Sequence, residues 1–123
     1  MANTVPFKLI TPTQVAYQGD AELVIAVTTE GEEGILPSHA PFLAALKPGV
    51  LRANVVEDGA TRRLEMATGE GFMQALPDGV TVLVDRALKF EDVDVAATRA
   101  ELASATDPSA IDFANAKLRL TGH

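Results

Sequence analysis

Residues 50–85, VLRANVVEDGATRRLEMATGEGFMQALPDGVTVLVD, are typical of antiparallel β-structure. Residues 50–56 alternate apolar and polar side chains, as a strand with one buried face does. The sequence Glu57-Asp58-Gly59-Ala60 predicts a hairpin turn, because Asp-Gly accepts the positive φ angles of a tight turn. Strands are predicted at 50–56, 62–68, 71–76 and 80–85.

Upstream of this stretch, residues 7–10 and 21–27 also have the composition of strands. Many short strands joined by glycine and proline turns favour a β-sandwich. Near residue 88 the composition changes, and alanine replaces glycine and proline. We therefore expect a mainly β fold with an α appendage: an N-terminal β-sandwich domain, residues 1–88, followed by a short C-terminal antiparallel α-helical hairpin, residues 89–123.

The two predicted helices are placed by their end signals. Glu91, Asp92 and Asp94 put negative charge where a first helix would begin. Pro108 suits the first turn of a second helix, which would end before Gly122. Each helix is three or four turns long and would be marginal alone, so the hairpin has to pack against something.

Composition excludes several classes of protein. The 123 residues have room for one compact domain with a short appendage, and no apolar run approaches the ~20 residues of a membrane span. Ten basic and seventeen acidic residues give a net charge of −7, which disfavours binding to nucleic acid or anionic lipid. With no cysteine and only His39 and His123, we expect neither disulfides nor a metal site.

Two motifs could carry chemistry, and we interpret both as structural. Ser38-His39 offers a nucleophile and a base, but adjacent side chains project in different directions and no local motif supplies an orienting acid. Gly69 and Gly71 precede a further strand instead of a helix, which predicts a bulge or tight turn and not a phosphate-binding loop. We therefore predict no catalytic residues.

Two further segments are candidates for contact with a partner. Residues 30–34 form an acidic loop, either a flexible solvated turn or a loop that docks by charge complementarity. In residues 35–49, three prolines frame an apolar patch in what should be a surface connection. Phe42, Leu43 and Leu46 therefore either fold back onto the sandwich or meet a partner.

Residues 30–41, EGEEGILPSHAP, resemble the Gly-x-x-Gly-Ile-x-Pro-x-His-Ala-Pro stretch of the epsilon subunit of F-type ATP synthase. Lys47-Pro48-Gly49, residues 68–72 (TGEGF) and residues 80–87 (VTVLVDRA) are similar to further parts of that family. In order and spacing these stretches cover most of residues 7–87. The division into a β-sandwich and a helical hairpin resembles the family too.

The resemblance implies a central-stalk (rotor) subunit that is not an enzyme by itself. It would couple ion flow through the membrane c-ring to ATP synthesis in the catalytic head through gamma, in a proton- or sodium-translocating ATP synthase. Alpha and beta subunits of the head are further candidate partners. The complex would place it peripherally on the cytoplasmic face of the bacterial inner membrane. The gamma-facing patch implied by the resemblance is His39, Ala40, Phe42 and Leu43, and the loop that faces the c-ring is Glu30, Gly31, Glu32 and Glu33.

In the hairpin the resemblance is weaker. Some relatives bind ATP through Ile/Leu-Asp-x-x-Arg-Ala, but here Val93 and Asp94 are followed by Ala97 at the arginine position. Arg99 lies about 200° further around the helix and is a poor substitute. We therefore expect no cofactor, with ATP binding weak or absent.

The hairpin is also short, at roughly 20 Å for each helix, so we expect it to stay folded on the sandwich. Inhibition of ATP hydrolysis by its extension would then be reduced or absent, which leaves only weak regulation open. Arg99, Lys117 and Arg119 are the cations it could offer to the head. Two alternatives stay open: a stand-alone β-sandwich binding module with a ligand pocket, and a small hydrolase that uses Ser38 and His39.

Overall fold

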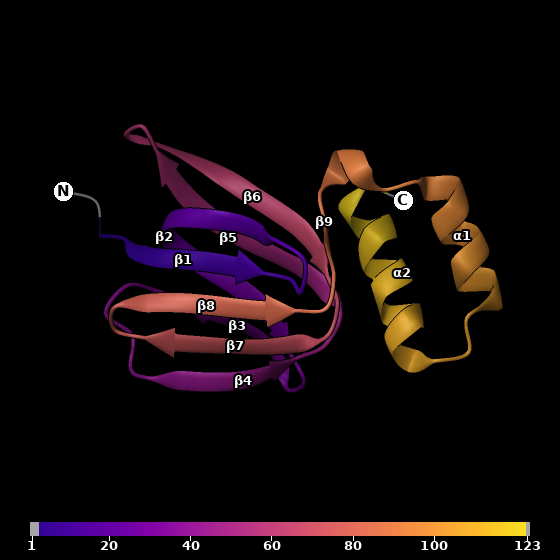
Figure 1. The fold of residues 1–123 in the computed structure, drawn as a ribbon, viewed down its shortest axis with the longest axis horizontal. Helices are drawn as coiled ribbons and strands as arrows, with labels where there is room; N and C mark the ends of the chain where they lie inside the picture. Colours follow the sequence, from indigo (N-terminus) through magenta and orange to yellow (C-terminus); the bar gives the residue numbers. More distant parts are fainter. Residues whose placement is uncertain (1–2, 123) are drawn as a thin grey trace.

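A computed structural model describes residues 3–122 (Figure 1). Within these residues the chain forms nine strands, a short 3-10 turn and two helices. In chain order they are β1 (Val5–Ile10), β2 (Val15–Thr28), β3 (Gly31–Ile35), β4 (Phe42–Leu46), β5 (Gly49–Glu57), β6 (Ala60–Thr68), β7 (Gly71–Leu76), β8 (Gly79–Val84), β9 (Ala87–Leu88), η1 (Phe90–Asp92), α1 (Val95–Ser104) and α2 (Pro108–Leu120).

The strands pack as a sandwich of two layers that share β2. One layer has the order β1-β8-β7-β4 and lies at the front in Figure 1. The other contains β2, β5, β6 and β9, with β3 paired to β2. The first part of β2 pairs with β1 and the last part with β5 and β3. The register of β2 shifts between Ala21 and Leu23, and such a bulge bends a strand from one layer into the other. The predicted β-sandwich is confirmed.

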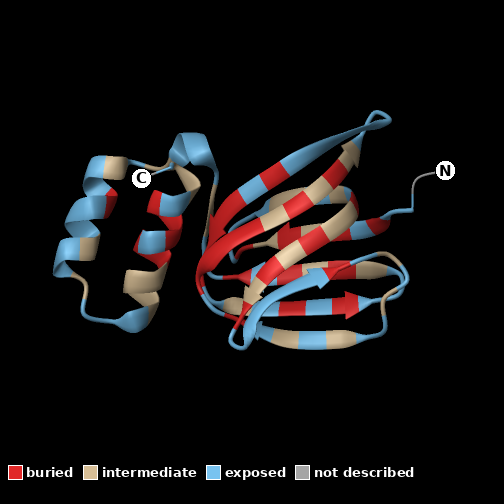
Figure 2. Ribbon diagram, turned by 180° about the vertical axis from the view of Figure 1, so that it is seen from behind, coloured by how far each residue is buried: buried red, intermediate tan, exposed pale blue. Residues whose placement is uncertain are grey.

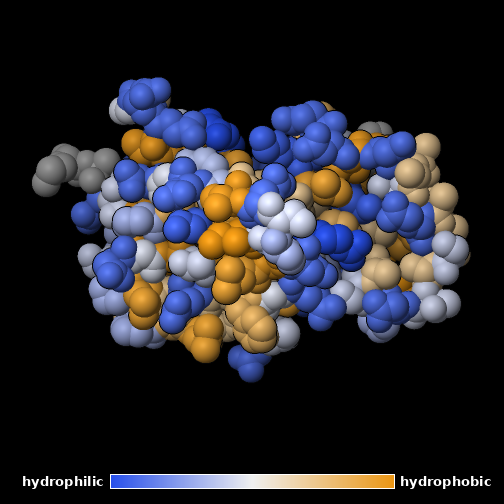
Figure 3. Space-filling model, in the orientation of Figure 1, coloured by the Kyte–Doolittle hydropathy of each residue, from blue (hydrophilic) through white to orange (hydrophobic). Residues whose placement is uncertain are grey.

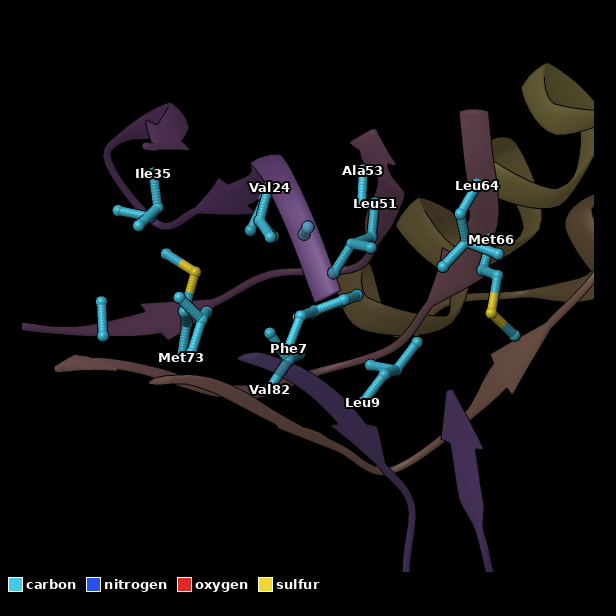
Figure 4. Close-up of a cluster of buried hydrophobic side chains, with 14 of the residues drawn as sticks. Phe7, Leu9, Val24, Ile35, Leu51, Ala53, Leu64, Met66, Met73 and Val82 are labelled. Carbon is cyan, nitrogen blue, oxygen red and sulfur yellow. The ribbon is translucent and has the colours of Figure 1, made fainter. Parts of the chain in front are cut away.

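The core lies between the two layers. Phe7, Leu9 and Val82 from the front layer point toward Val24 and Leu51 of the other layer (Figure 4). All five side chains are almost completely removed from water. Buried and exposed residues alternate along most strands, so each strand of this core gives one face to the interior (Figure 2). Removal of this apolar surface from water is the main force that holds the sandwich together.

The predicted turns form for the predicted reasons. Asp58 and Gly59 have φ angles of 52° and 78°, the left-handed values that a two-residue hairpin turn requires. A Cβ atom on Gly71 would overlap the backbone oxygen of Leu83, so the chain can pass this corner only as glycine. Gly71 is thus the first residue of β7, opposite Val84 of β8, and it serves a close approach of two strands where a bulge or tight turn was predicted.

Two segments differ from the predictions. Residues 42–46 were expected in a surface connection, and this was wrong: they form β4, which pairs with β7 along its whole length. Residues 30–34 were expected to form an acidic loop, but from Gly31 on they belong to β3 (Gly31–Ile35), which pairs with β2 from Val24 to Thr28. β4 forms because it pairs with β7, which is distant in the sequence. β3 forms because it pairs with β2, although its own sequence, GEEGI, is atypical of a strand. β2 is also longer than the predicted strand 21–27.

The helical hairpin is present, but its first helix begins later than predicted. Residues 90–92 form the 3-10 turn, and α1 starts only at Val95. Asp94 is its N-cap, where the carboxylate accepts a hydrogen bond from the backbone N–H of Ala97 at 3.0 Å. Asp107 caps α2 in the same way through Ala110, with Pro108 in the first turn as predicted. Neither helix in the described part of the chain is long and apolar enough to span a membrane.

Only α2 packs closely on the sandwich, and α1 lies outside it (Figure 1). Phe113 and Ala116 of α2 form a small second core with Val50 and Ala67. The Cζ atom of Arg86, in the connection between β8 and β9, lies 4.1 Å from the centre of the Phe113 ring. This cation–π contact joins the sandwich to α2.

Candidate interaction surfaces

The front layer carries an exposed apolar row across its outer face. The strand registers place Ala45 of β4 beside Phe72 of β7, Phe72 beside Leu83 of β8, and Leu83 beside Ile10 of β1. Phe72 is 57% exposed and Leu83 49% exposed. We call these four residues the front apolar row. In Figure 3 hydrophobic side chains gather in a band over the middle of this layer.

The surroundings of the front apolar row are mixed in character. The neighbouring row across the sheet contains Gln74, Thr81 and Lys8, with Leu43 at its β4 end. Leu43 is 69% exposed and points away from the core. An exposed apolar patch with a polar rim is the usual composition of a protein–protein interface.

Two hollows lie at opposite ends of this outer face. One, of about 370 Å³, borders the front apolar row at Ile10 and Leu83. The other, of about 420 Å³, lies beside Lys8, Asp20 and Asp78, over the glycine backbone of β2 and β8. The first extends the apolar surface, and the second is bordered by charges of both signs.

The four predicted gamma-facing residues do not share one surface. Leu43 lies on the outer face, whereas Phe42 points inward and packs against the core. Ala40 is exposed in the turn that precedes β4. His39 is half-buried and donates from Nδ1 to the backbone oxygen of Leu36 at 2.8 Å, which closes its own turn.

His39 and Ser38 do not form a nucleophile–base pair. The Nε2 atom of His39 is buried without a hydrogen-bond partner among residues 3–122. Ser38 has a φ of 67°, and within the same range its side chain makes no hydrogen bond to His39 or to a carboxylate. Nucleophilic catalysis needs that contact, so this turn has the geometry of a structural element.

The sequence prediction missed most of the front apolar row. Phe72 and Leu83 stand at outward positions of their strands, where alternation should place polar side chains. That departure from the pattern was the available signal. Their alignment across four strands is not visible in the sequence, because it depends on the register of each strand pair.

The acidic segment is an ordered turn and strand. The hydroxyl of Thr28 accepts from the backbone N–H of Glu30 at 3.1 Å and donates to the oxygen of Gly31 at 2.6 Å. Gly31 has a φ of 121°. Glu32 pairs with Arg52 at 2.7 Å, while the described residues provide no ion pair for Glu30 or Glu33. Two of the three carboxylates are therefore free to meet external positive charge.

The hairpin has fewer free cations than predicted. Lys117 is only 6% exposed, and its Nζ donates to the Glu101 carboxylate of α1 at 2.9 Å. It also lies over the Phe113 ring, so the expectation that Lys117 could contact a partner was wrong. Arg99 and Arg119 are exposed. Of the ATP-motif positions, Asp94 is engaged as a helix cap and Ala97 is exposed without a charge to offer.

Close to the hairpin turn between β5 and β6, Tyr17, Glu57 and Arg62 interact. The Tyr17 hydroxyl donates to Glu57 at 3.2 Å, and Arg62 forms an ion pair with the same carboxylate. The hydrogen bond from Arg62 lowers the pKa of Glu57, and burial together with Glu57 raises the pKa of Tyr17. Nowhere in residues 3–122 do three or more histidine or acidic side chains gather in a way that could hold a metal ion.

Comparisons with known proteins agree with this architecture. Residues 4–90 match the family model described as "ATP synthase, Delta/Epsilon chain, beta-sandwich domain". A relative from Chromobacterium violaceum named ATP synthase epsilon chain is 40% identical over 89 residues, which are 72% of this chain but only 62% of the relative. A relative of the same name from Teredinibacter turnerae is 35% identical over 98% of this chain and 87% of its own length.

Two solved structures share the fold. A chain of the Euglena gracilis mitochondrial ATP synthase (OSCP/F1/c-ring) is matched over 98% of this chain and 78% of its own length, with a TM-score of 0.67 and 20% identity. A chain from the central stalk/c-ring of the Tetrahymena thermophila mitochondrial ATP synthase is matched over 96% of this chain and 93% of its own length, with a TM-score of 0.65 and 18% identity. Because residues 4–90 match the family model, and because the Teredinibacter turnerae relative is 35% identical over 87% of its own length, the chain belongs to the ATP synthase epsilon-chain family.

Proposed function

We propose that this chain is a non-catalytic central-stalk subunit of an ATP synthase. It would couple ion flow through the c-ring to ATP synthesis in the catalytic head by way of gamma. In a bacterium this places it peripherally on the cytoplasmic face of the inner membrane. The names of its relatives and the complexes that contain its structural neighbours support this role.

The front apolar row is the observation that carries the proposal. A rotor subunit must transmit torque, so its docking face should lie on a stiff element. Phe72 and Leu83 lie in the middle of a hydrogen-bonded layer, on strands paired on both sides. We therefore assign gamma to this face, with Leu43 at its margin. His39 and Phe42 would not contact gamma directly. They would hold the turn before β4 and β4 itself in position, so that Leu43 faces gamma.

The turn between β2 and β3 is the proposed contact to the c-ring. Glu30 and Glu33 provide negative charge for basic loops of the ring, and the bonds of Thr28 hold the turn in one conformation. Contacts of this kind fix register and orientation more than they add affinity. Whether the ring carries protons or sodium is decided by residues of the ring.

We propose that the hairpin stays on the sandwich and that ATP binds weakly or not at all. Phe113 is held between the second core and Arg86, and Asp94 is used as a cap. Calorimetry should detect no low-micromolar ATP site. Deletion of residues 89–123 should barely change ATP hydrolysis by the assembled enzyme, whereas activation by several-fold would show that the hairpin inhibits.

The test of the proposed role is binding of the purified chain to a gamma-containing head complex that lacks its small stalk subunit. The expected result is a tight one-to-one complex that Leu43→Glu weakens. Phe90→Glu is the matched control, because Phe90 is an apolar side chain that is 58% exposed on another surface. If the chain does not bind a folded cognate complex, the proposal fails and a stand-alone binding module becomes the better account.

A further inference from the structure

The outer edge of β6 is open over most of its length. β6 pairs with β5 from Ala60 to Thr68 on one side. On the other side, β9 covers only Ala67 and Thr68. In the described part of the chain no strand pairs with that edge between Ala60 and Met66, and Figure 1 shows β6 along the upper margin of the sandwich. Such an edge presents unpaired backbone donors and acceptors to a further strand.

A hollow of about 430 Å³ follows this open edge. It is lined by four consecutive residues of β6, by the start of the 3-10 turn and by the end of α2. The lining residues are Arg62, Arg63, Leu64, Glu65, Lys89, Phe90, Glu91 and Leu120. β9 lies beside β6 as a neighbouring strand, but after Leu88 the chain turns into η1, which contacts β6 without pairing with it as a strand. We call this hollow the β6 edge groove.

Basic residues are concentrated around the groove. A second hollow of about 230 Å³ adjoins it and shares Arg63, Glu65 and Leu120. The linings of the two hollows contain five of the ten basic residues of the chain but only three of its seventeen acidic residues. Elsewhere the chain has five basic and fourteen acidic residues. Two of the five, Arg62 and Arg52, are already paired with Glu57 and Glu32, so the cations available to a ligand are Arg63, Lys89 and Arg119.

Several of these cations have weak internal partners or none. Arg63 approaches Glu65 only at 3.8 Å, with both side chains about half exposed. Lys89 and Arg119 form no ion pair with any residue between 3 and 122. Exposed pairs of this kind contribute little stability, so their charges can be redirected to an external carboxylate at little cost.

The groove also contains an apolar contact point. Phe90 is 58% exposed beside the open edge, and Leu120 is half-buried at the end of α2. Successive side chains of an added strand point to opposite faces, so a strand with alternating acidic and apolar residues could meet both the cations and Phe90. The same cations would repel the basic edge of a second copy, which is how edge strands avoid self-pairing.

We propose that the β6 edge groove binds an extended acidic segment of another protein by strand addition. Backbone hydrogen bonds to β6 supply affinity, and Arg63 and Lys89 select for acidic side chains. The site lies on the layer opposite the front apolar row, so this proposal is independent of the role assigned to that row.

The test uses the full chain labelled with ¹⁵N and a blocked peptide of alternating glutamate and valine, as long as the open stretch of β6. The expected result is saturable binding that shifts the amide resonances of residues 62–65 and 89–91. Raised salt should weaken it, since the charges are exposed. Arg63→Glu with Lys89→Glu should weaken it by about tenfold or more. Lys8→Glu with Lys47→Glu, on the other layer, makes the same change in net charge and should change the binding little.

A peptide with N-methylated backbone amides separates strand addition from charge attraction alone. It retains the carboxylates but loses the donors, so its binding should be lost. Equal binding of the methylated peptide, resonance shifts outside the groove, or no saturable binding would each overturn the proposal. Formation of chain dimers through β6, detected by sedimentation and abolished by Arg63→Glu, would also overturn it in favour of self-association.

Discussion

Lys117 and Glu101 provide a test of how the hairpin is held together. Lys117 is 6% exposed, and the Glu101 side chain that neutralises it is 55% exposed. Replacement of Glu101 by alanine leaves a cation buried without its partner, whereas replacement of Lys117 by methionine removes the buried charge itself. The two variants break the same ion pair, yet physical reasoning predicts different costs.

The magnitude follows from the burial of the two groups. Loss of one partner from a fully buried pair costs about 3–5 kcal/mol, and exposed pairs contribute about 0–1 kcal/mol. This pair is buried at one end only, so we expect Glu101→Ala to destabilise the packed hairpin by about 2 kcal/mol. Lys117→Met keeps the length of the side chain and its contact with Phe113, and should cost less than about 1 kcal/mol.

Hydrogen exchange of the α1 and α2 amides measures these costs as opening free energies. Glu101→Ala should accelerate exchange by about 30-fold and Lys117→Met by less than about fivefold. The double variant should resemble Lys117→Met, because no buried charge is then left. Arg99→Met, at an exposed cation of α1, is the control. If Lys117→Met accelerates exchange as much as Glu101→Ala, the reasoning is refuted.

Three further predictions concern other parts of the molecule. Phe72 is 57% exposed, so about half of a side-chain area of about 200 Å² can be buried against gamma, and Phe72→Ala should weaken gamma binding by up to about 100-fold. Phe90→Ala, at a residue that is 58% exposed on another surface, should leave gamma binding unchanged; equal effects of the two variants in a titration of the head complex would refute the assigned face. Gly71→Ala should lower the free energy of unfolding, measured in urea, by about 2–3 kcal/mol, because the added Cβ would overlap the backbone oxygen of Leu83. Gly34→Ala, where an added Cβ meets only ordinary contacts, should lower it much less; similar losses for the two variants would contradict the close approach at Leu83. Because the pKa of Glu57 is lowered in the folded chain, its contribution to stability is present above the ordinary carboxyl range and is lost as the pH falls through the lowered pKa. Glu57→Gln should therefore lower the urea midpoint at about pH 7, and this difference should shrink steadily on acidification; a difference that does not depend on pH would show that Arg62 does not stabilise the carboxylate.

The sequence predicted the features that depend on local chemistry. Asp58-Gly59 forms its turn because only certain residues accept left-handed φ angles, and Pro108 marks the start of α2 because its missing N–H is not needed there. Alternation in residues 50–56 indicated which side of β5 is buried. These signals are contained in a few consecutive residues.

The features that were missed depend on partners far away in the sequence. β3 has the sequence GEEGI, which has little intrinsic preference for a strand, and it forms because β2 offers it an edge. β4 follows two prolines and resembles a connection, but its pairing with β7 makes it a strand. A lysine at position 117 suggests an exposed site, and its burial follows from the packing of α1 against α2.

The residues proposed to contact gamma illustrate the same limit. The motif around His39 indicated the right region of the chain, but motif positions do not show which side chains point outward. Of the four residues inferred from the resemblance, Leu43 reaches the outer face, and Phe72 and Leu83 join it only through strand register. A surface formed by four strands is a property of the folded sheet.

The central claim is that the front apolar row faces gamma. Hydroxyl-radical footprinting of the chain, free and bound to a gamma-containing head complex, tests it directly at individual side chains. The account predicts that labelling of Phe72, Leu83 and Leu43 falls on binding while labelling of Phe90 is unchanged. If Phe72 and Leu83 stay fully labelled in the bound state, gamma docks elsewhere and the claim is contradicted.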